Sequence, residues 1–155
     1  MTIKVEDNKI IFFFFLEAPI EKVFDDYTTK ALFEKWFHPK DASTKVFRFN
    51  AVSGGDAFYA IKTPTMTSYT LAEYKTVKRP YLIEYIDSFA TPQGAKDTKM
   101  PSMKITLSFS KSNTTKTTVT STSVFPTKEA AQQVINMGVE QGMNQTLDQL
   151  DALLK

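Results

Sequence analysis

The chain has 155 residues, of which 42% are hydrophobic and 13% aromatic, and its formal net charge is only +2. This length and composition are typical of one globular domain over residues 1–155 and exclude a disordered chain. The absence of cysteine excludes disulfides and thiolate catalysis. The weak net charge gives no reason to expect binding to nucleic acid or to an anionic membrane.

The first predicted strand covers residues 9–16, because the run from residue 10 to residue 16 is apolar on both faces of a pleat. This run is too short to cross a bilayer, and no signal-peptide pattern precedes it, so a cytoplasmic protein is expected. The phenylalanines from Phe12 to Phe15 need cover on both faces. Either the helices that follow cover the outer face, or that face is exposed and forms a homodimer with a second copy.

Two short helices are predicted after this strand. Pro19 suits a first helical turn, and apolar residues then recur at helical spacing, at Ile20, Val23, Phe24 and Tyr27. Thr29 can cap a second helix, which Pro39 ends because proline disfavours helical geometry in the residue before it.

The middle of the chain alternates between strands and turns. Strands are predicted over residues 46–50, 58–62, 68–77, 81–90, 103–109 and 117–123. The strand over 103–109 has the clearest alternation of apolar and polar residues, which is typical of a half-buried antiparallel strand. Residues 91–101, with two prolines and one glycine, are predicted to form a long surface loop.

A long C-terminal helix is predicted over residues 128–154, with Thr127 as its cap. Its apolar stripe is wide, so the helix needs a broad surface to pack against. The order of elements predicts an α+β fold, in which a curved antiparallel sheet of about six or seven strands surrounds the long helix.

Several segments in this order resemble the activator of heat-shock protein 90 ATPase homologue family, which has the START/Bet v 1-like (SRPBCC) helix-grip fold. The segments are residues 18–24, 32–39 (LFEKWFHP), the Gly54-Gly55 turn, 80–89 (PYLIEYIDSF) and 125–154. Two positions depart from the family pattern: His38 stands where glycine is usual, and Met143 where an aromatic residue is usual. The resemblance implies a hydrophobic cavity between the sheet and the C-terminal helix, and a small apolar or aromatic molecule as its ligand.

The residues offer little support for catalysis. His38 is the only histidine, so a histidine-based triad or a transition-metal site would depend on it alone. No metal and no cofactor is therefore expected. His38 itself either hydrogen-bonds to the backbone at a helix end beside Trp36, or is a polar group at the mouth of a pocket.

Asp87 shares a predicted strand face with Tyr85 and Phe89. An inward-facing carboxylate needs a partner or a ligand, and Arg48 is a candidate partner. The alternative is that a bulge turns Asp87 to solvent. Gly138 and Gly142 lie four residues apart on the buried helix face, where each costs up to about 1 kcal/mol of helix stability relative to alanine. Their presence favours either a close contact between helix and sheet or space for a ligand.

The predicted function is binding of a small, largely apolar ligand without catalysis. The predicted ligand-binding residues, each of which also suits an ordinary core position, are Trp36, His38, Tyr59, Tyr74, Tyr85, Asp87, Phe89, Met103, Met137, Gly138, Gln141 and Met143. Two alternatives remain open. One is an interaction module for a chaperone ATPase, and the other is a cyclase- or hydrolase-like enzyme that uses His38, Asp87 or a tyrosine as an acid–base group.

Overall fold

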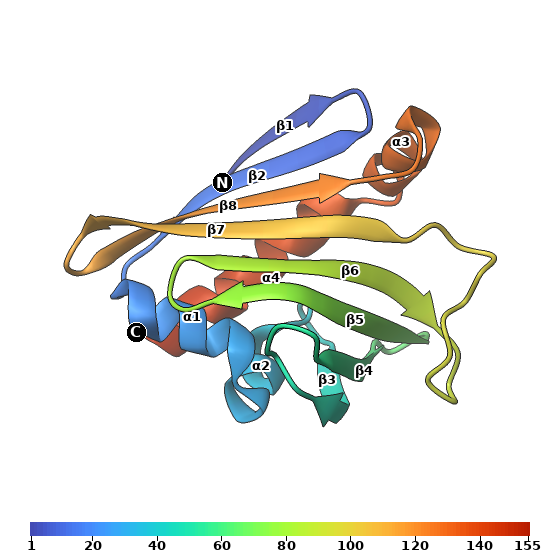
Figure 1. The fold of residues 1–155 in the computed structure, drawn as a ribbon, viewed down its shortest axis with the longest axis horizontal. Coiled ribbons are helices and arrows are strands. Elements are labelled where there is room, and N and C mark those ends of the chain that lie inside the picture. Colours follow the sequence, from blue (N-terminus) through green and yellow to red (C-terminus); the bar gives the residue numbers. More distant parts are fainter.

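A curved, eight-stranded antiparallel sheet forms the frame of the molecule in the computed structural model, which describes all 155 residues (Figure 1). The strand order is β1-β2-β8-β7-β6-β5-β4-β3. The strands are β1 (Thr2–Glu6), β2 (Lys9–Leu16), β3 (Ser43–Phe49), β4 (Asp56–Lys62), β5 (Thr67–Lys78), β6 (Leu82–Ala90), β7 (Met103–Asn113) and β8 (Lys116–Val124). The predicted α+β arrangement is confirmed.

The sequence-based strand count was low because it did not include β1. This strand pairs with β2 from Thr2 opposite Phe13 to Glu6 opposite Lys9. Only Ile3 of its five residues is even partly buried, so β1 has no alternation of apolar and polar residues that could have revealed it. Strand β2 therefore has backbone partners on both sides, β1 and β8.

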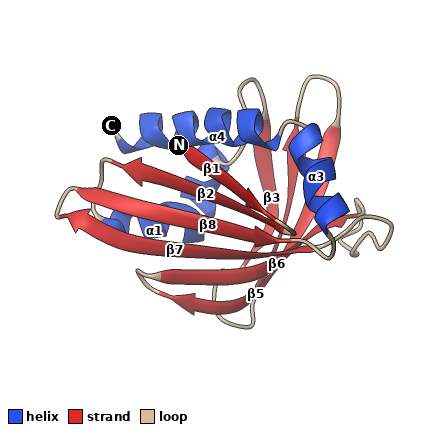
Figure 2. Ribbon diagram, turned by 90° about the horizontal axis from the view of Figure 1, so that it is seen from above, coloured by secondary structure: helices blue, strands red, loops and turns tan.

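The helices lie over the concave side of the sheet (Figure 2). They are α1 (Ile20–Thr28), α2 (Lys30–Trp36), α3 (Lys128–Asn136) and α4 (Val139–Leu154). Thr127 caps α3 as predicted, because its side chain accepts a hydrogen bond from the Ala130 N–H. Thr29 occupies the capping position of α2, but its side chain makes no capping hydrogen bond. None of the four helices combines the length and apolar character that crossing a bilayer requires.

The prediction of one continuous helix over residues 128–154 is wrong at Gly138. This residue has a φ of 87°, in the left-handed region that ends helices, and it separates α3 from α4. The N–H of Gly138 donates to the Ile135 carbonyl at 3.0 Å, closing the last turn of α3. Because apolar residues continue at helical spacing on both sides of the break, the periodicity did not show it. Gly142, in contrast, lies inside α4.

Neither glycine of the C-terminal region makes a close contact with the sheet. A Cβ atom added at Gly142 would meet nothing within 4 Å, and one at Gly138 would meet only the Gln141 side chain at 3.8 Å. The interpretation of these glycines as close-packing residues is therefore wrong. The sequence-based alternative, that space is left around them, agrees with the structure.

The aromatic run of β2 divides between two environments. Phe12 and Phe14 are buried in the core, whereas Phe13 and Phe15 are 40% and 62% exposed on the other face. Helix α1 packs on the concave side instead, where Phe24 lies 5.3 Å from Phe109 of β7 between ring centroids. The prediction that the short helices cover the outer face is therefore wrong, and that face is exposed. Pairing with a second copy through it stays a prediction.

Candidate functional site

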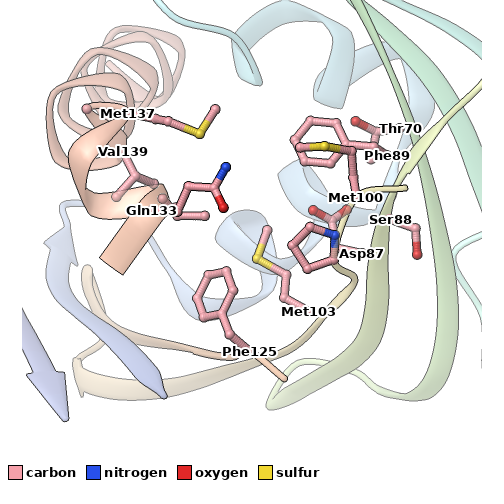
Figure 3. Close-up of a pocket in the computed structure, with 13 residues that line it drawn as sticks. Thr70, Asp87, Ser88, Phe89, Met100, Met103, Phe125, Gln133, Met137 and Val139 are labelled. Carbon is pink, nitrogen blue, oxygen red and sulfur yellow. The ribbon is translucent and has the colours of Figure 1, made fainter. Parts of the chain in front are cut away.

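The largest cavity of the molecule, with a volume of about 290 Å³, lies between strands β6 and β7 and the junction of α3 with α4. Figure 3 shows Gln133, Met137 and Val139 on the helix side, opposite Phe89 and Met100 on the sheet side. The remaining lining residues are Thr70, Asp87, Ser88, Pro101, Met103, Phe125, Val134 and Gly138. Because Gly138 separates α3 from α4, the helical path is interrupted at the edge of this cavity instead of continuing across it.

A second cavity of about 130 Å³ adjoins the first on its inner side. The two share five lining residues, which are Asp87, Met103, Phe125, Val134 and Val139. The second cavity extends inward to Trp36, Tyr85 and Met143, and most of its other lining is aliphatic or aromatic. The two cavities therefore form neighbouring spaces that a ligand longer than the first could occupy together.

Asp87 lies at the boundary between these two cavities. It faces Met103 across the β6–β7 ladder and Ala72 across the β5–β6 ladder. Its Oδ1 atom is buried and has no hydrogen-bond partner. Burial raises the pKa of the Asp87 carboxyl to about 7, because low-dielectric surroundings disfavour the charged form.

The predicted inward position of Asp87 agrees with the structure, but its predicted pairing with Arg48 is wrong. The side chain is not turned to solvent, since it lines both cavities. Arg48 is not its partner, because Arg48 is exposed and pairs with Asp56. The register of β3 against β4 shifts between Val46 and Arg48. The Nε and Nη2 atoms of Arg48 donate to the two Asp56 carboxylate oxygens at 2.7 and 3.0 Å. This bidentate contact leaves Asp87 without a counter-charge.

Asp87 acts on the pKa of three nearby tyrosines, whereas burial alone accounts for its own raised pKa. Tyr59, Tyr74 and Tyr85 come from β4, β5 and β6, respectively. Burial raises the pKa of each hydroxyl above its usual value, and the neighbouring Asp87 raises it further. All three hydroxyls therefore stay neutral over the physiological range, and none can neutralise the carboxylate by charge.

The structure gives the predicted site residues different positions. Asp87, Phe89, Met103, Met137 and Gly138 line the larger cavity. Trp36, Tyr85 and Met143 line the smaller one. Tyr59 and Tyr74 instead line a small space of about 20 Å³, which borders the smaller cavity at Tyr85 and is near the volume that one water molecule needs.

His38 and Gln141 line no cavity, so their prediction as pocket residues disagrees with the structure. The Nδ1 atom of His38 lies 3.2 Å from the Pro39 carbonyl oxygen, which agrees with the alternative of a backbone contact at a helix end. Gln141 is exposed on α4 because its side chain follows the outer face of the helix. The break at Gly138 changes the direction of the chain just before it, which the continuous-helix prediction could not include.

Sequence reasoning missed several lining residues. Met100 and Pro101 belong to the loop before β7, which was expected only to cover the surface. Thr70 is a polar residue on β5, where its inward placement depends on register, and Ser88 lies at the cavity edge with its hydroxyl directed away from the space (Figure 3). Of these missed residues, only Phe125 and Val134 could have been predicted as lining residues, because they are apolar and lie beside or within the predicted C-terminal helix.

Chemically, the site is an apolar container with few polar groups. Its polar lining consists of hydroxyls, one amide and one carboxyl, and the Ser88 and Ser102 hydroxyl oxygens lie 2.7 Å apart in a hydrogen bond. No group of three or more His, Asp or Glu side chains is placed to hold a metal ion. Such a lining can bury a hydrocarbon body and orient it through one or two polar contacts.

Comparisons with known proteins agree with this architecture. Residues 17–155 match the family model described as Activator of Hsp90 ATPase homolog 1-like protein. No curated protein sequence matches the chain significantly. A solution NMR structure of a protein from Staphylococcus epidermidis is 62% identical, with a TM-score of 0.89 over 99% of this chain and 93% of that chain.

Two more distant structures support the fold alone. A crystal structure of a protein from Mycobacterium smegmatis is 23% identical, with a TM-score of 0.91 over 100% of this chain and 96% of that chain. A solution NMR structure of a protein from Arthrobacter aurescens is 22% identical, with a TM-score of 0.90 over 99% and 90%, respectively. With the family model matching nearly the whole chain, and with the helix-grip arrangement present, this protein belongs to the Activator of Hsp90 ATPase homolog 1-like protein family.

Proposed function

We propose that this protein binds a small, largely apolar molecule in the cavity beneath the α3–α4 junction, without converting it chemically. The single observation that carries the proposal is the cavity of about 290 Å³, which approaches the lower end of the range for small-molecule sites. Its methionine and aromatic lining suits a hydrocarbon body, because methionine adapts to irregular shapes. Burial of apolar ligand surface supplies about 25 cal/mol per Å² toward binding.

The mouth of the cavity lies where two segments meet. Met137, at the end of α3, is 66% exposed, and Met100 and Pro101 line the cavity from the loop before β7. None of these side chains is fixed by an ion pair or a side-chain hydrogen bond in this structure. Moving these apolar side chains to admit a ligand would cost little compared with breaking polar contacts.

A library of lipids and aromatic metabolites provides the test. Native mass spectrometry detects which compounds remain bound, and thermal-shift measurements rank them, since a ligand that binds only the folded state raises Tm. A bound compound is then recovered and its mass compared with that of the compound added. An unchanged mass supports binding without turnover, and a changed mass overturns that part of the proposal.

A matched pair of variants locates the binding site. Val134 lines both cavities from α3, so Val134→Trp is expected to fill the space and abolish binding. Gln132 is exposed on the same helix, so Gln132→Trp adds the same ring outside the site and should leave binding unchanged. Absence of binding to the unaltered protein, or equal binding by both variants, overturns the proposed site.

A further inference from the structure

Asp87 is the single charged side chain that lines either of the two adjoining cavities. Helices α3 and α4 contribute Gln133, Val134, Val139 and Met143, and strand β7 contributes only apolar residues. Strand β8 adds two serines to the inner cavity. The charge of Asp87, where it is ionised, is therefore opposed by no basic group inside the molecule.

Both arginines, and two of the lysines, form ion pairs with acidic residues other than Asp87. Arg48 pairs with Asp56, and the second arginine, Arg79, pairs with Asp25 on α1 at 2.9 Å. Two lysines of β7 and the loop before it pair on the surface, Lys96 with Glu73 and Lys104 with Glu84. No lysine or arginine lines either cavity, so a cationic group of a ligand would be the first counter-charge inside them.

The physical chemistry of the lining discriminates between possible ligand headgroups. An anionic headgroup would be repelled by Asp87 and would find no basic partner. A neutral hydroxyl could donate one hydrogen bond to Oδ1. A protonated amine adds charge attraction to that hydrogen bond, and charge-assisted hydrogen bonds are roughly twice as strong as neutral ones.

The cavity also offers partners for the rest of an ammonium group. The Thr70 hydroxyl and the Gln133 side-chain amide oxygen line the same space and can accept its other N–H bonds. Phe89 and Phe125 present aromatic rings to this space (Figure 3), and such rings attract cations. These groups surround a site that is otherwise apolar.

We propose that the cavity selects hydrophobic amines, whose ammonium group donates to Asp87 Oδ1 while the hydrocarbon part fills the space between β6, β7 and the α3–α4 junction. This inference rests on the proposed ligand-binding function and names the chemical class of its ligand. Forming a buried ion pair costs free energy because both charges lose water. The Asp87 carboxylate has already lost its water in the folded protein, so only the ammonium group is desolvated on binding.

Three probes with an eight-carbon chain distinguish the contribution of the headgroup to affinity from that of the hydrocarbon chain. They are octylamine, octanol and octanoate. Titration calorimetry at pH 8, where Asp87 is mostly ionised, should give tighter binding of octylamine than of octanol, by about tenfold or more. Octanoate should bind more weakly than octanol. Equal affinity for amine and alcohol, or a preference for octanoate, overturns the inference while leaving hydrocarbon binding intact.

The variant Asp87→Asn tests the residue itself. It should remove the preference for octylamine and leave the affinity for octanol within about threefold, since the body of the cavity is unchanged. An amine preference that survives in a folded Asp87→Asn protein overturns the assignment to Asp87. If none of the probes binds to the unaltered protein, the proposed function and this inference fail together. If octanol binds and octylamine binds no more tightly, only this inference fails, so the two failures are distinguishable.

The pH profile of octylamine binding gives a second measurement that needs no variant. The titratable groups coupled to Asp87 are the neutral hydroxyls of Tyr59, Tyr74 and Tyr85, whose pKa values it raises, and no other charged side chain lines either cavity. Octylamine affinity should therefore fall as the pH decreases below about 7, because Asp87 takes up a proton. Octanol affinity should change much less, and parallel profiles for the two probes overturn the inference.

Discussion

The space between the sheet and the helices has two differently built ends. The packed end, between α2 and strands β3 and β4, is filled by interlocking rings: Phe33 lies 4.5 Å from Phe37 and 5.2 Å from Tyr59, centroid to centroid. The cavity left there measures about 20 Å³. The open end, at the α3–α4 junction, is lined by methionines, several aliphatic and aromatic residues and Gly138, and retains about 290 Å³.

The difference shows how one sheet supports both a rigid core and a hollow. Aromatic rings have few rotatable bonds and interlock through edge-to-face contacts, so they close the packed end. Methionine is flexible and glycine carries no side chain, so fewer rigid rings fill the open end than the packed end. Residue type at the helix facing the sheet, more than the sheet itself, therefore determines where the space remains.

The largest expected effect comes from removing the buried ring of Trp36, which lies on α2 between the packed end and the inner cavity. Trp36 is 1% exposed, packs against Tyr27 at 4.7 Å and donates from Nε1 to the Asp26 carbonyl oxygen at 2.8 Å. Trp36→Ala should lower the free energy of unfolding by about 3–5 kcal/mol in urea titrations, through lost packing and an unfilled void.

Its control lies in the open end. Met137 is also large and apolar but 66% exposed, so Met137→Ala should change the free energy of unfolding by less than about 0.5 kcal/mol. Comparable losses for Trp36→Ala and Met137→Ala would contradict the distinction between the two ends.

A smaller effect is expected from Asp87, at the boundary of the open end. Its pKa in the folded state is about 7, above the usual 3.8, so the folded protein binds more protons between these values than the unfolded chain does. The contribution of Asp87 to stability is therefore full below about pH 4 and decreases as the pH rises to about 7, by about 2–4 kcal/mol. Above that pH it stays constant.

Chemical denaturation of the wild type and of Asp87→Asn across this pH range measures the effect. The difference between their free energies of unfolding should change between about pH 4 and pH 7 and stay level above. Asp26 is also buried with a raised pKa, but it is present in both proteins, so its contribution cancels. A difference that is independent of pH would show that Asp87 titrates normally.

The smallest effect comes from the two glycines at the open end. Gly138 has a φ of 87°, so Gly138→Ala should destabilise the protein by about 1 kcal/mol through left-handed strain. Gly142 lies in ordinary helix with nothing within 4 Å of an added Cβ, so Gly142→Ala should stabilise it by about 0.5–1 kcal/mol. Urea titration of both variants checks the opposite signs, and equal signs would contradict a break confined to Gly138.

Much of the fold could be predicted because its patterns are local. The alternation over residues 103–109 identifies most of β7, and the helical spacing after Pro19 identifies α1, from the chain alone. The break at Gly138 could not be predicted in the same way, since apolar residues continue across it at helical spacing. The one sign of the break is a glycine within the predicted helix. A glycine there indicates either room beside the helix or a change in the direction of the chain, and the sequence does not distinguish the two.

The site was less predictable because it depends on register between distant strands. The inward face of Asp87 follows from alternation in β6, but its lack of a partner does not. A register shift in β3 accompanies the pairing of Arg48 with Asp56 on the surface, and nothing in the local pattern of β3 reports that shift. Met100 joined the cavity through a loop, where periodicity carries no information.

Strand β1 has a consequence for how copies of this chain meet at high concentration. Without β1, the phenylalanine-rich strand β2 would be an unpaired edge strand of the sheet. Uncharged segments of this kind promote aggregation. Because β1 takes that position with Lys4 and Glu6 along five residues, a colliding molecule finds a short, charged strand in place of the aromatic one. The hairpin thus lets the protein keep its run of phenylalanines without offering it as a template for fibre growth.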